Sequence, residues 1–375
     1  MSDFDVVVAG GSISGLVAAR EIARASLSVA VVEEDAEIGT PEHCGGLVSM
    51  DGMRNLGIVP DAIENNRVKK ARILSPSNGF DLSAERQKVV VIDRRELDKQ
   101  VALQAQRAGA EIRVKCSMRS AVPDGDGYVV KTSEGELKCD YLVDARGVAS
   151  IINRNREGVL SSAQYEVYAP WIERDTIEVA FNSEKYPGFF AWVIPTGEGQ
   201  GKVGVAGKGI NAANALKGYM DAKGPHSSVR KVYAPIWVSG PVDNFVSGHT
   251  VIVGDAAGQT KPTTAGGIYT CGMGGMLAGR AIAGGRLDEY QKGWESAFKD
   301  EFDKMLLARR LLERLDNRAI DDLFAAIPKD KVEEASSTGD FDFHAAALSK
   351  MLSAKSAARM AKALLGNEIR RLVDG

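Results

Sequence analysis

Residues 4–33 read FDVVVAGGSISGLVAAREIARASLSVAVVE, and this stretch decides the fold. Its pattern predicts a short buried strand over Phe4 to Ala9 and a glycine-rich turn over residues 10–15. A helix over Leu16 to Ala25 and a second apolar strand over Leu27 to Val32 follow. A glycine turn between a strand and a helix presents backbone amides and the helix N-terminus to a pyrophosphate, where the helix dipole favours negative charge. The stretch therefore predicts a dinucleotide-binding βαβ unit.

An acidic residue at the end of the second strand supports this interpretation. Glu33 stands eighteen positions after Gly15, where a carboxylate can accept hydrogen bonds from both ribose hydroxyls of an adenosine. Ser12 replaces the middle glycine of the usual G-x-G-x-x-G pattern, whereas Gly10 and Gly15 keep the turn and the helix packing. A purely structural βα turn is the alternative.

Composition and charge exclude several classes of protein. The 375 residues have a formal net charge of −3, so no overall positive field exists to hold a nucleic-acid backbone. With 44% hydrophobic and 26% charged residues the chain can bury a core, which excludes wholesale disorder. Forty glycines without a G-X-Y period indicate tight turns and close backbone approaches to a ligand.

The sequence also bears on location and metals. No stretch approaches about 18 uninterrupted apolar residues, and the N-terminus has no basic region followed by an apolar run. The four cysteines form no C-x-x-C pair, and the four histidines show no ligand spacing with them. We therefore expect a cytoplasmic protein without a metal site, and peripheral contact with a membrane stays open.

The β-rich middle of the chain separates two parts with βα character. We expect an α/β fold in which residues 1–66, 88–163 and 245–288 form a discontinuous Rossmann-type domain. An inserted antiparallel β-rich domain takes residues 67–87 and 164–244, and a helical region takes 289–375. Lys329 to Asp340 is the best candidate for a mobile link.

Three further segments resemble motifs of the group-A flavoprotein family. Residues 251–258, VIVGDAAG, resemble the ribityl-binding motif, in which the aspartate, here Asp255, holds a ribityl hydroxyl. Residues 139–147, CDYLVDARG, are similar to the strand written D-x-V-V-x-A-x-G, and Val91 to Asp98 resembles the helix start R-x-x-(F/L)-D. Taken alone, Asp255 could be an ordinary helix N-cap and Arg94 a solvated surface charge. The four motifs in the family's order imply FAD and an FAD-binding domain of the group-A type.

Two regions resemble the geranylgeranyl reductase family of FAD-dependent oxidoreductases, over roughly residues 3–290. Residues 38–47, IGTPEHCGGL, look like its G-x-P-x-x-C-G-x-G-L region with the last glycine shifted by one. Residues 259–268, QTKPTTAGGI, resemble the stretch after its ribityl aspartate. The resemblance implies that Cys44 lies near the isoalloxazine ring, where a thiol could tune the flavin or assist proton delivery. A small buried hydrophobe is the alternative for Cys44.

Residues 187–195, PGFFAWVIP, are similar to the reductases' substrate-pocket signature P-x-x-Y-x-W-x-F-P. Phe190 replaces the tyrosine and Ile194 the phenylalanine, which makes the pocket more apolar. The same segment is similar to the halogenase signature W-x-W-x-I-P, with Phe190 at the first tryptophan position. Ordinary core packing of aromatic residues is the third interpretation.

The reductase resemblance implies that FAD transfers hydride to isoprenoid double bonds of archaeal-type membrane lipid precursors. Cys44 is the predicted catalytic residue, and Phe190, Trp192 and Pro195 are the predicted substrate pocket. The predicted cofactor-binding residues are Gly10, Gly11, Ser14, Gly15, Glu33, Cys44, Gly45, Leu47, Arg94, Met118, Asp255, Gly267 and Ile268. An FAD-dependent monooxygenase or halogenase is the alternative enzyme, and a non-catalytic FAD-containing redox sensor is a third reading.

The expected partners follow from this assignment. The substrate would be an isoprenoid lipid, and NAD(P)H or a redox protein such as ferredoxin would supply electrons transiently, because residues 197–209 read as a hairpin turn rather than a second dinucleotide site. Residues 345–375 carry an excess of four positive charges, which suits either anionic lipid headgroups or a solvated helix face.

Overall fold

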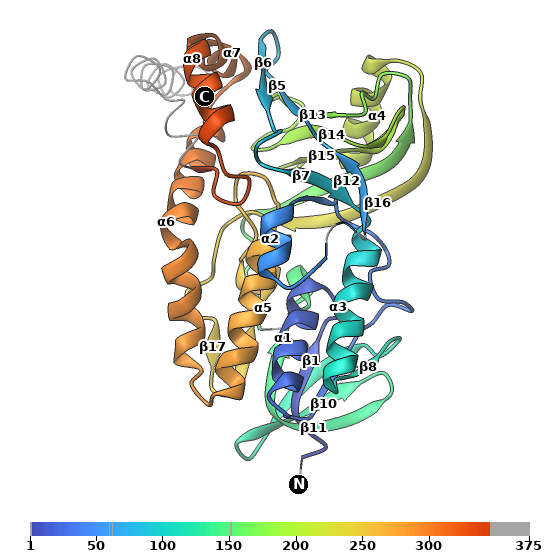
Figure 1. Cartoon of the computed structure of the whole chain (residues 1–375), viewed down its shortest axis with the longest axis vertical. Coiled ribbons are helices and arrows are strands. Elements are labelled where there is room, and N and C mark those ends of the chain that lie inside the picture. The colour runs from blue at the N-terminus through green and yellow to red at the C-terminus, as the bar shows by residue number, and fades with distance from the viewer. Residues whose placement is uncertain (1, 60, 62, 151, 346–375) are drawn as a thin grey trace.

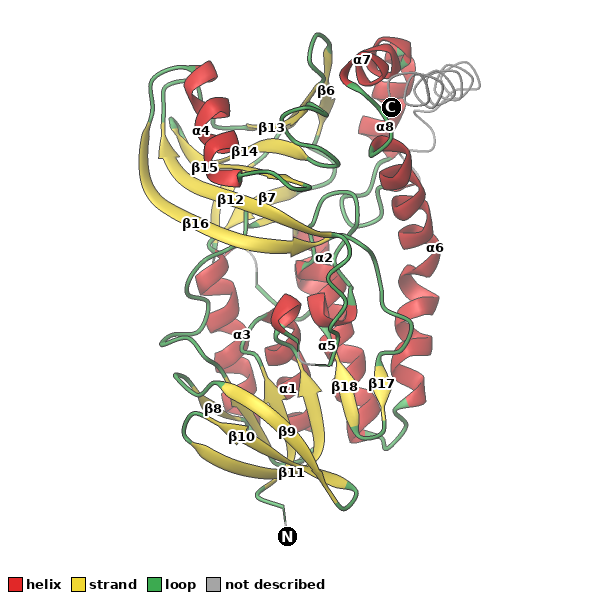
Figure 2. Ribbon diagram, turned by 180° about the vertical axis from the view of Figure 1, so that it is seen from behind, coloured by secondary structure: helices red, strands yellow, loops and turns green. Residues whose placement is uncertain are grey.

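The computed structural model describes residues 2–345 except 60, 62 and 151. An eight-stranded sheet forms the half of the molecule that holds the N-terminus (Figures 1 and 2). Five of its strands are parallel in the order β18-β11-β1-β2-β8, and β17 pairs antiparallel with β18 at one edge. The hairpin β9–β10 extends from β11. The bounds are β1 Phe4–Ala9, β2 Val29–Val32, β8 Glu111–Arg113, β9 Met118–Asp124, β10 Gly127–Thr132, β11 Gly135–Asp144, β17 Val246–Ser247 and β18 Thr250–Ile252.

Both faces of this parallel sheet are covered, as its valine-rich strands require. Val6 and Val8 of β1 pack toward the helices, while Val7 and Ala9 pack toward the β9–β10 hairpin. The covering helices are α1 (Ile13–Arg24), α3 (Arg94–Ala108) and α5 (Ile268–Ala283).

A seven-stranded sheet forms the other half, in the order β16-β12-β15-β14-β13-β5-β6. All its pairs are antiparallel except β13 with β5. Helix α4 (Ala212–Lys223) packs on one face. A three-stranded sheet, β3-β7-β4, has Leu47–Ser49, Val89–Ile92 and Glu64–Arg67 as its strands. The bounds of the larger sheet are β5 Lys70–Leu74, β6 Gly79–Ser83, β12 Val159–Tyr168, β13 Thr176–Phe181, β14 Phe190–Gly197, β15 Gln200–Gly207 and β16 Ser227–Trp237.

The remaining helices are α2 (Met50–Asn55), α6 (Asp288–Leu312), α7 (Asn317–Ala326) and α8 (Lys329–Thr338). Helix α6 runs along α5 and buries Tyr290, Trp294 and Phe298 in the main core. No helix of residues 2–345, as far as they are described, is long and apolar enough to cross a membrane.

The predicted fold class is confirmed: a Rossmann-type α/β sheet, a separate β-rich sheet and C-terminal helices are all present. The domain boundaries 1–66, 88–163 and 245–288, 67–87 and 164–244, and 289–375 stay a prediction. The basic segment after residue 345 lies outside the described residues.

The predicted mobile link over Lys329 to Asp340 was wrong, because most of this segment forms α8. Pro328 stands at its N-cap, where a missing backbone N–H costs nothing. Lys331 pairs with Glu334 at 2.7 Å one turn along, and the hydroxyls of Ser337 and Thr338 donate to the Glu334 carbonyl. Serine and threonine therefore bond within the helix here instead of opening it.

Glycines let α1 and α5 approach backbone to backbone. A Cβ on Gly275 of α5 would lie 2.1 Å from the Ser14 carbonyl oxygen, and one on Gly279 would lie 2.7 Å from the Ala18 carbonyl oxygen. The two helices thus meet at a distance that no larger residue permits.

We expect Gly275→Ala to lower the free energy of unfolding by about 1–3 kcal/mol, because the added methyl forces α5 away from α1. Chemical denaturation followed by circular dichroism measures the change. Gly218→Ala in α4 is the matched control, since its Cβ meets nothing within 4 Å and should raise stability by up to about 1 kcal/mol. Equal stabilities of Gly275→Ala and the parent protein would refute the close-packing argument.

Candidate cofactor and active site

The glycine turn between β1 and α1 leaves no room for side chains. Gly10 has φ +112°, and a Cβ there would lie 2.5 Å from the Ala145 carbonyl oxygen. A Cβ on Gly15 would lie 2.1 Å from the Gly10 carbonyl oxygen. The N–H of Gly11 donates to Glu33 Oε2 at 2.6 Å, which brings the acid at the end of β2 against the turn. This backbone cradle beside a carboxylate fits the adenosine pyrophosphate part of a dinucleotide.

Asp255 lies close to the same turn. Gly254 precedes it with φ +69°, and a Cβ there would lie 2.5 Å from Ser14 Oγ. The half-buried carboxylate accepts a hydrogen bond from the Thr260 hydroxyl, and it caps no helix because Val253 is the N-cap of this turn. Burial raises the pKa of Asp255, an effect that the Thr260 hydrogen bond opposes. The N-cap interpretation of Asp255 is therefore wrong, and its second oxygen can serve a hydroxyl of a ligand.

Arg94 begins α3 and is not a solvated surface charge, because only 13% of its side chain is exposed. Its Nη2 donates to Asp98 Oδ1 at 2.8 Å, whereas its buried Nε has no hydrogen-bond partner in the described structure. Burial opposes the charge of this guanidinium, but Asp98 and the adjacent Cys44 raise the pKa of Arg94 above its ordinary value. A buried donor without an acceptor indicates that a ligand completes the site.

Cys44 lies at a small pocket of about 40 Å³ whose lining brings together four predicted site residues: Cys44, Leu47, Gly267 and Ile268. Gly267 and Ile268 mark the N-terminus of α5, where the helix dipole favours negative charge. A Cβ on Gly45 would lie 2.4 Å from Ile194 Cδ1, so this loop touches the seven-stranded sheet. Cys44 is half-buried, whereas Cys116, Cys139 and Cys271 are buried.

The predicted substrate residues all lie on β14. Phe190 and Trp192 belong to one aromatic cluster with ring centroids 6.1 Å apart. Because side chains alternate along a strand, Pro195 lies on the face of β14 opposite to that of Phe190 and Trp192. The Pro195 carbonyl accepts a hydrogen bond from Asn66 at 3.0 Å.

Met118 lies apart from Cys44, at the start of β9 and in the core beneath the hairpin. It lies on the Glu33 side of the site, because Cys116, two residues earlier, donates its N–H to the Glu33 carbonyl at 2.8 Å.

Sequence reasoning missed three polar residues around Cys44, namely Glu42, Gln164 and Lys202. Glu42 and Lys202 are 3% exposed and form an ion pair at 2.5 Å. The one available signal was a lysine inside the apolar strand segment KVGVA at residues 202–206.

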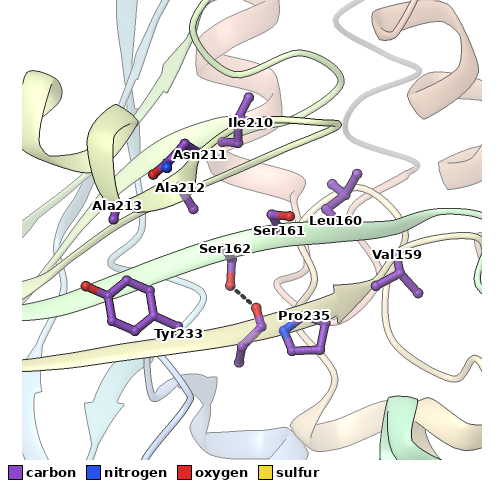
Figure 3. Close-up of a pocket in the computed structure, with 11 residues that line it drawn as sticks. Val159, Leu160, Ser161, Ser162, Ile210, Asn211, Ala212, Ala213, Tyr233 and Pro235 are labelled. Carbon is purple, nitrogen blue, oxygen red and sulfur yellow. Dashed lines mark hydrogen bonds between the residues drawn. The ribbon is translucent and has the colours of Figure 1, made fainter.

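A larger surface pocket of about 430 Å³ lies between β12, β16 and the start of α4 (Figure 3). It contains none of the predicted site residues, and the Ser162 hydroxyl on its wall already donates to the Ala234 carbonyl at 2.5 Å. Within the described residues no three His, Cys, Asp or Glu side chains are placed to hold a metal ion.

We expect Asp255→Asn to lower FAD retention and, in the FAD-free protein, to raise thermal stability. Because the pKa of Asp255 is raised in the folded protein, its ionised carboxylate destabilises the FAD-free fold. This destabilisation is present at pH values above the pKa of the same group in the unfolded chain, about 4. The FAD-free variant should therefore have a higher Tm than wild type at pH 7, with the difference shrinking as the pH falls towards about 4. The purified variant should retain less FAD, because an amide is a weaker acceptor than a carboxylate.

Visible flavin absorbance per chain and thermal unfolding between acidic and neutral pH measure the two effects. Asp140→Asn, at an exposed acid, is the control and should change neither. Wild-type FAD content in Asp255→Asn would contradict the assignment of this carboxylate.

Comparison with known proteins agrees with this geometry. The family described as "FAD binding domain" matches residues 3–283. Digeranylgeranylglycerophospholipid reductase 2 of Methanopyrus kandleri is 30% identical over 367 residues, covering 88% of this chain and 92% of that protein. FAD is thus the cofactor, as expected.

Two solved structures show the same fold. A geranylgeranyl bacteriochlorophyll reductase-like protein of Thermoplasma acidophilum has a TM-score of 0.83 at 24% identity, covering 96% of this chain and 98% of that one. A flavin-dependent brominase has a TM-score of 0.66 at 17% identity, covering 98% and 99%. From the family match and the reductase relative, the chain belongs to the FAD-binding family of flavoproteins that includes the digeranylgeranylglycerophospholipid reductases.

Proposed function

We propose that this protein is an FAD-dependent reductase that saturates carbon–carbon double bonds of geranylgeranyl chains in archaeal-type membrane lipid precursors. The observation that carries the proposal is the contact between the Cys44 loop and an apolar strand: Gly45 packs on Ile194, and Trp192 and Phe190 continue the same face of β14. An apolar aromatic face suits a prenyl chain. The reductase relative supports the same substrate class.

The cofactor-binding residues are assigned in three groups, one for each part of FAD. The glycine turn and Glu33 would hold the adenosine diphosphate part, with Met118 near its outer end. Asp255 and Arg94 would hold the ribityl and pyrophosphate oxygens, for which the unpartnered Nε of Arg94 is a ready donor. The ring would lie against the remaining predicted residues Cys44, Gly45, Leu47, Gly267 and Ile268.

When bound and reduced, FAD supplies a hydride to one carbon of the alkene. An isolated alkene is a poor electrophile, so alignment by the protein must contribute heavily, up to about 7–11 kcal/mol. Trp192 and Phe190 would orient the prenyl chain, and the packing of Gly45 on Ile194 would exclude water. The Cys44 thiol, which accepts the Gly46 N–H at 3.3 Å, would guide a proton toward the other alkene carbon.

The electron donor and the membrane contact belong to the same proposal. Residues 198–199 join β14 to β15 as a hairpin turn, which supports a transient donor such as NAD(P)H or ferredoxin over a second resident dinucleotide. Peripheral membrane contact rests on the basic segment 345–375, which lies outside the described residues from position 346 on.

We expect anaerobic, dithionite-reduced protein to reoxidise on addition of a geranylgeranyl lipid. Product mass should rise by about two units per double bond, because one hydride and one proton are added. Stopped-flow absorbance and mass spectrometry follow the two events. Absence of reoxidation without oxygen, with hydroxylated or halogenated product in its presence, would support the alternative that the brominase-like fold allows.

We expect Cys44→Ser to keep wild-type FAD content but to lower kcat for alkene reduction by about 100-fold, the usual contribution of a positioned proton-transfer group. Steady-state kinetics on FAD-loaded enzyme measures the loss. Cys139→Ala, which removes a buried thiol of β11, is the control and should keep wild-type kcat. Unchanged kcat in Cys44→Ser would show that the thiol takes no part in the chemistry.

A further inference from the structure

The main-chain carbonyl of Cys44 accepts two hydrogen bonds from the seven-stranded sheet. Gln164 Nε2 of β12 donates at 3.2 Å, and Lys202 Nζ of β15 donates at 3.1 Å. We propose that Gln164 and Lys202 are positioning residues that set the Cys44 thiol relative to the substrate strand; this rests on the proposed reductase function. Neither residue belongs to a recognised cofactor motif of the sequence.

Gln164 connects Cys44 to Trp192 through the register of the sheet. Gln164, Gly204 and Trp192 stand opposite one another on β12, β15 and β14. A Cβ on Gly204 would lie 2.3 Å from the Trp192 indole, so the missing side chain lets the indole cross β15. Trp192 Nε1–H then donates to Gln164 Oε1 at 3.1 Å. Two consecutive hydrogen bonds run from the proposed substrate face to the Cys44 carbonyl.

The chemistry of the three groups determines the orientation of the Gln164 amide. An indole N–H can only donate and a backbone carbonyl can only accept. The group between them must accept on one side and donate on the other, as a side-chain amide does. Glutamate would keep the bond to Trp192 and lose the donor to Cys44, and leucine would lose both.

Lys202 supplies the second, fixed anchor. Its Nζ is held by Glu42 Oε1 at 2.5 Å, and Glu42 also accepts from the Arg94 N–H at 3.1 Å and from Arg230 Nη2 at 3.0 Å. A buried ion pair whose hydrogen bonds are satisfied in this way fixes geometry more than it adds stability. The ammonium therefore holds the Cys44 carbonyl at a set place between α3 and β15.

The two hydrogen-bond donors to the Cys44 carbonyl, Lys202 and Gln164, have different partners. Lys202 is tied to the fixed Glu42 pair, whereas Gln164 is tied to Trp192, the side chain on which the proposed substrate would pack. A prenyl chain that moves the indole would change the hydrogen bond from Gln164 to the Cys44 carbonyl, while the bond from Lys202 persists. The structure thus links substrate position to thiol position.

Alkylation of Cys44 by iodoacetamide tests this link without any substrate, because the other three cysteines are buried. In FAD-loaded protein we expect Gln164→Leu to speed alkylation and to lower kcat, each by about fivefold, the effect of losing the neutral hydrogen bond to the Cys44 carbonyl. Gln164→Glu should behave likewise, and Trp192→Phe should show part of the effect. Trp237→Phe is the matched control, because its Nε1 donates to the Gly240 carbonyl at 2.7 Å, and its alkylation rate should equal that of wild type.

A double-variant cycle distinguishes a hydrogen-bonded connection from Trp192 through Gln164 to Cys44 from a general loss of rigidity around Cys44. Trp192→Phe combined with Gln164→Leu should label no faster than Gln164→Leu alone, because the second bond is already lost. Cys44 in Lys202→Met should be alkylated still faster than in Gln164→Leu. If Lys202→Met fails to fold, the alkylation rates of the Gln164 variants alone test the proposal.

Wild-type labelling and kcat in Gln164→Leu, or additive effects in the double variant, would overturn the inference. Failure of the wild-type protein to reduce a prenyl lipid would instead overturn the proposed function, which labelling does not measure.

Discussion

The close approach of backbone segments around Gly10 and Gly15 is the constraint on which the site depends. The Ala145 carbonyl oxygen, just after β11, occupies the space where a Gly10 side chain would stand, and the Gly10 carbonyl oxygen occupies that of a Gly15 side chain. Glycine at Gly275 brings α5 against α1 in the same way. The ends of β1, β2 and β11 therefore converge with Asp255 on one turn, and Glu33 meets Gly11 there. Exposed backbone amides beside a carboxylate and a helix N-terminus are what a dinucleotide requires.

The loop of residues 42–46 is the second place where distant parts meet. The Glu42 side chain of this loop accepts a hydrogen bond from the Arg94 N–H of α3, and the Cys44 carbonyl accepts from Lys202 and Gln164 of the seven-stranded sheet. Burying a lysine and a glutamate costs desolvation, which their mutual attraction and the hydrogen bonds of Glu42 offset. The same contacts place Cys44 beside Gly267 and Ile268. The Cys44 thiol therefore lies between the proposed cofactor-binding residues and the apolar strand β14.

Local patterns predicted the elements next to the glycine turns well. The strand over Phe4–Ala9 and the helix start within Val91 to Asp98 both form as expected, because strong periodicity and a helix cap act within a few residues. Local patterns failed at α8, where serine and threonine bond inside the helix. They also gave no sign of α4, whose Leu216 and Met220 become an apolar face only against the β-rich sheet.

The sequence by itself determined the dinucleotide turn, the acid that follows it and the likeness to flavoenzymes, since these depend on residues close together in the chain. Tertiary structure alone decided that Arg94 is buried with a free Nε, that Asp255 is no helix cap, and that Gln164 and Lys202 reach Cys44. Gln164 lies 120 residues from Cys44, and its partner Trp192 is set by strand register. Register and burial arise from packing across the whole fold, and no local pattern carries them.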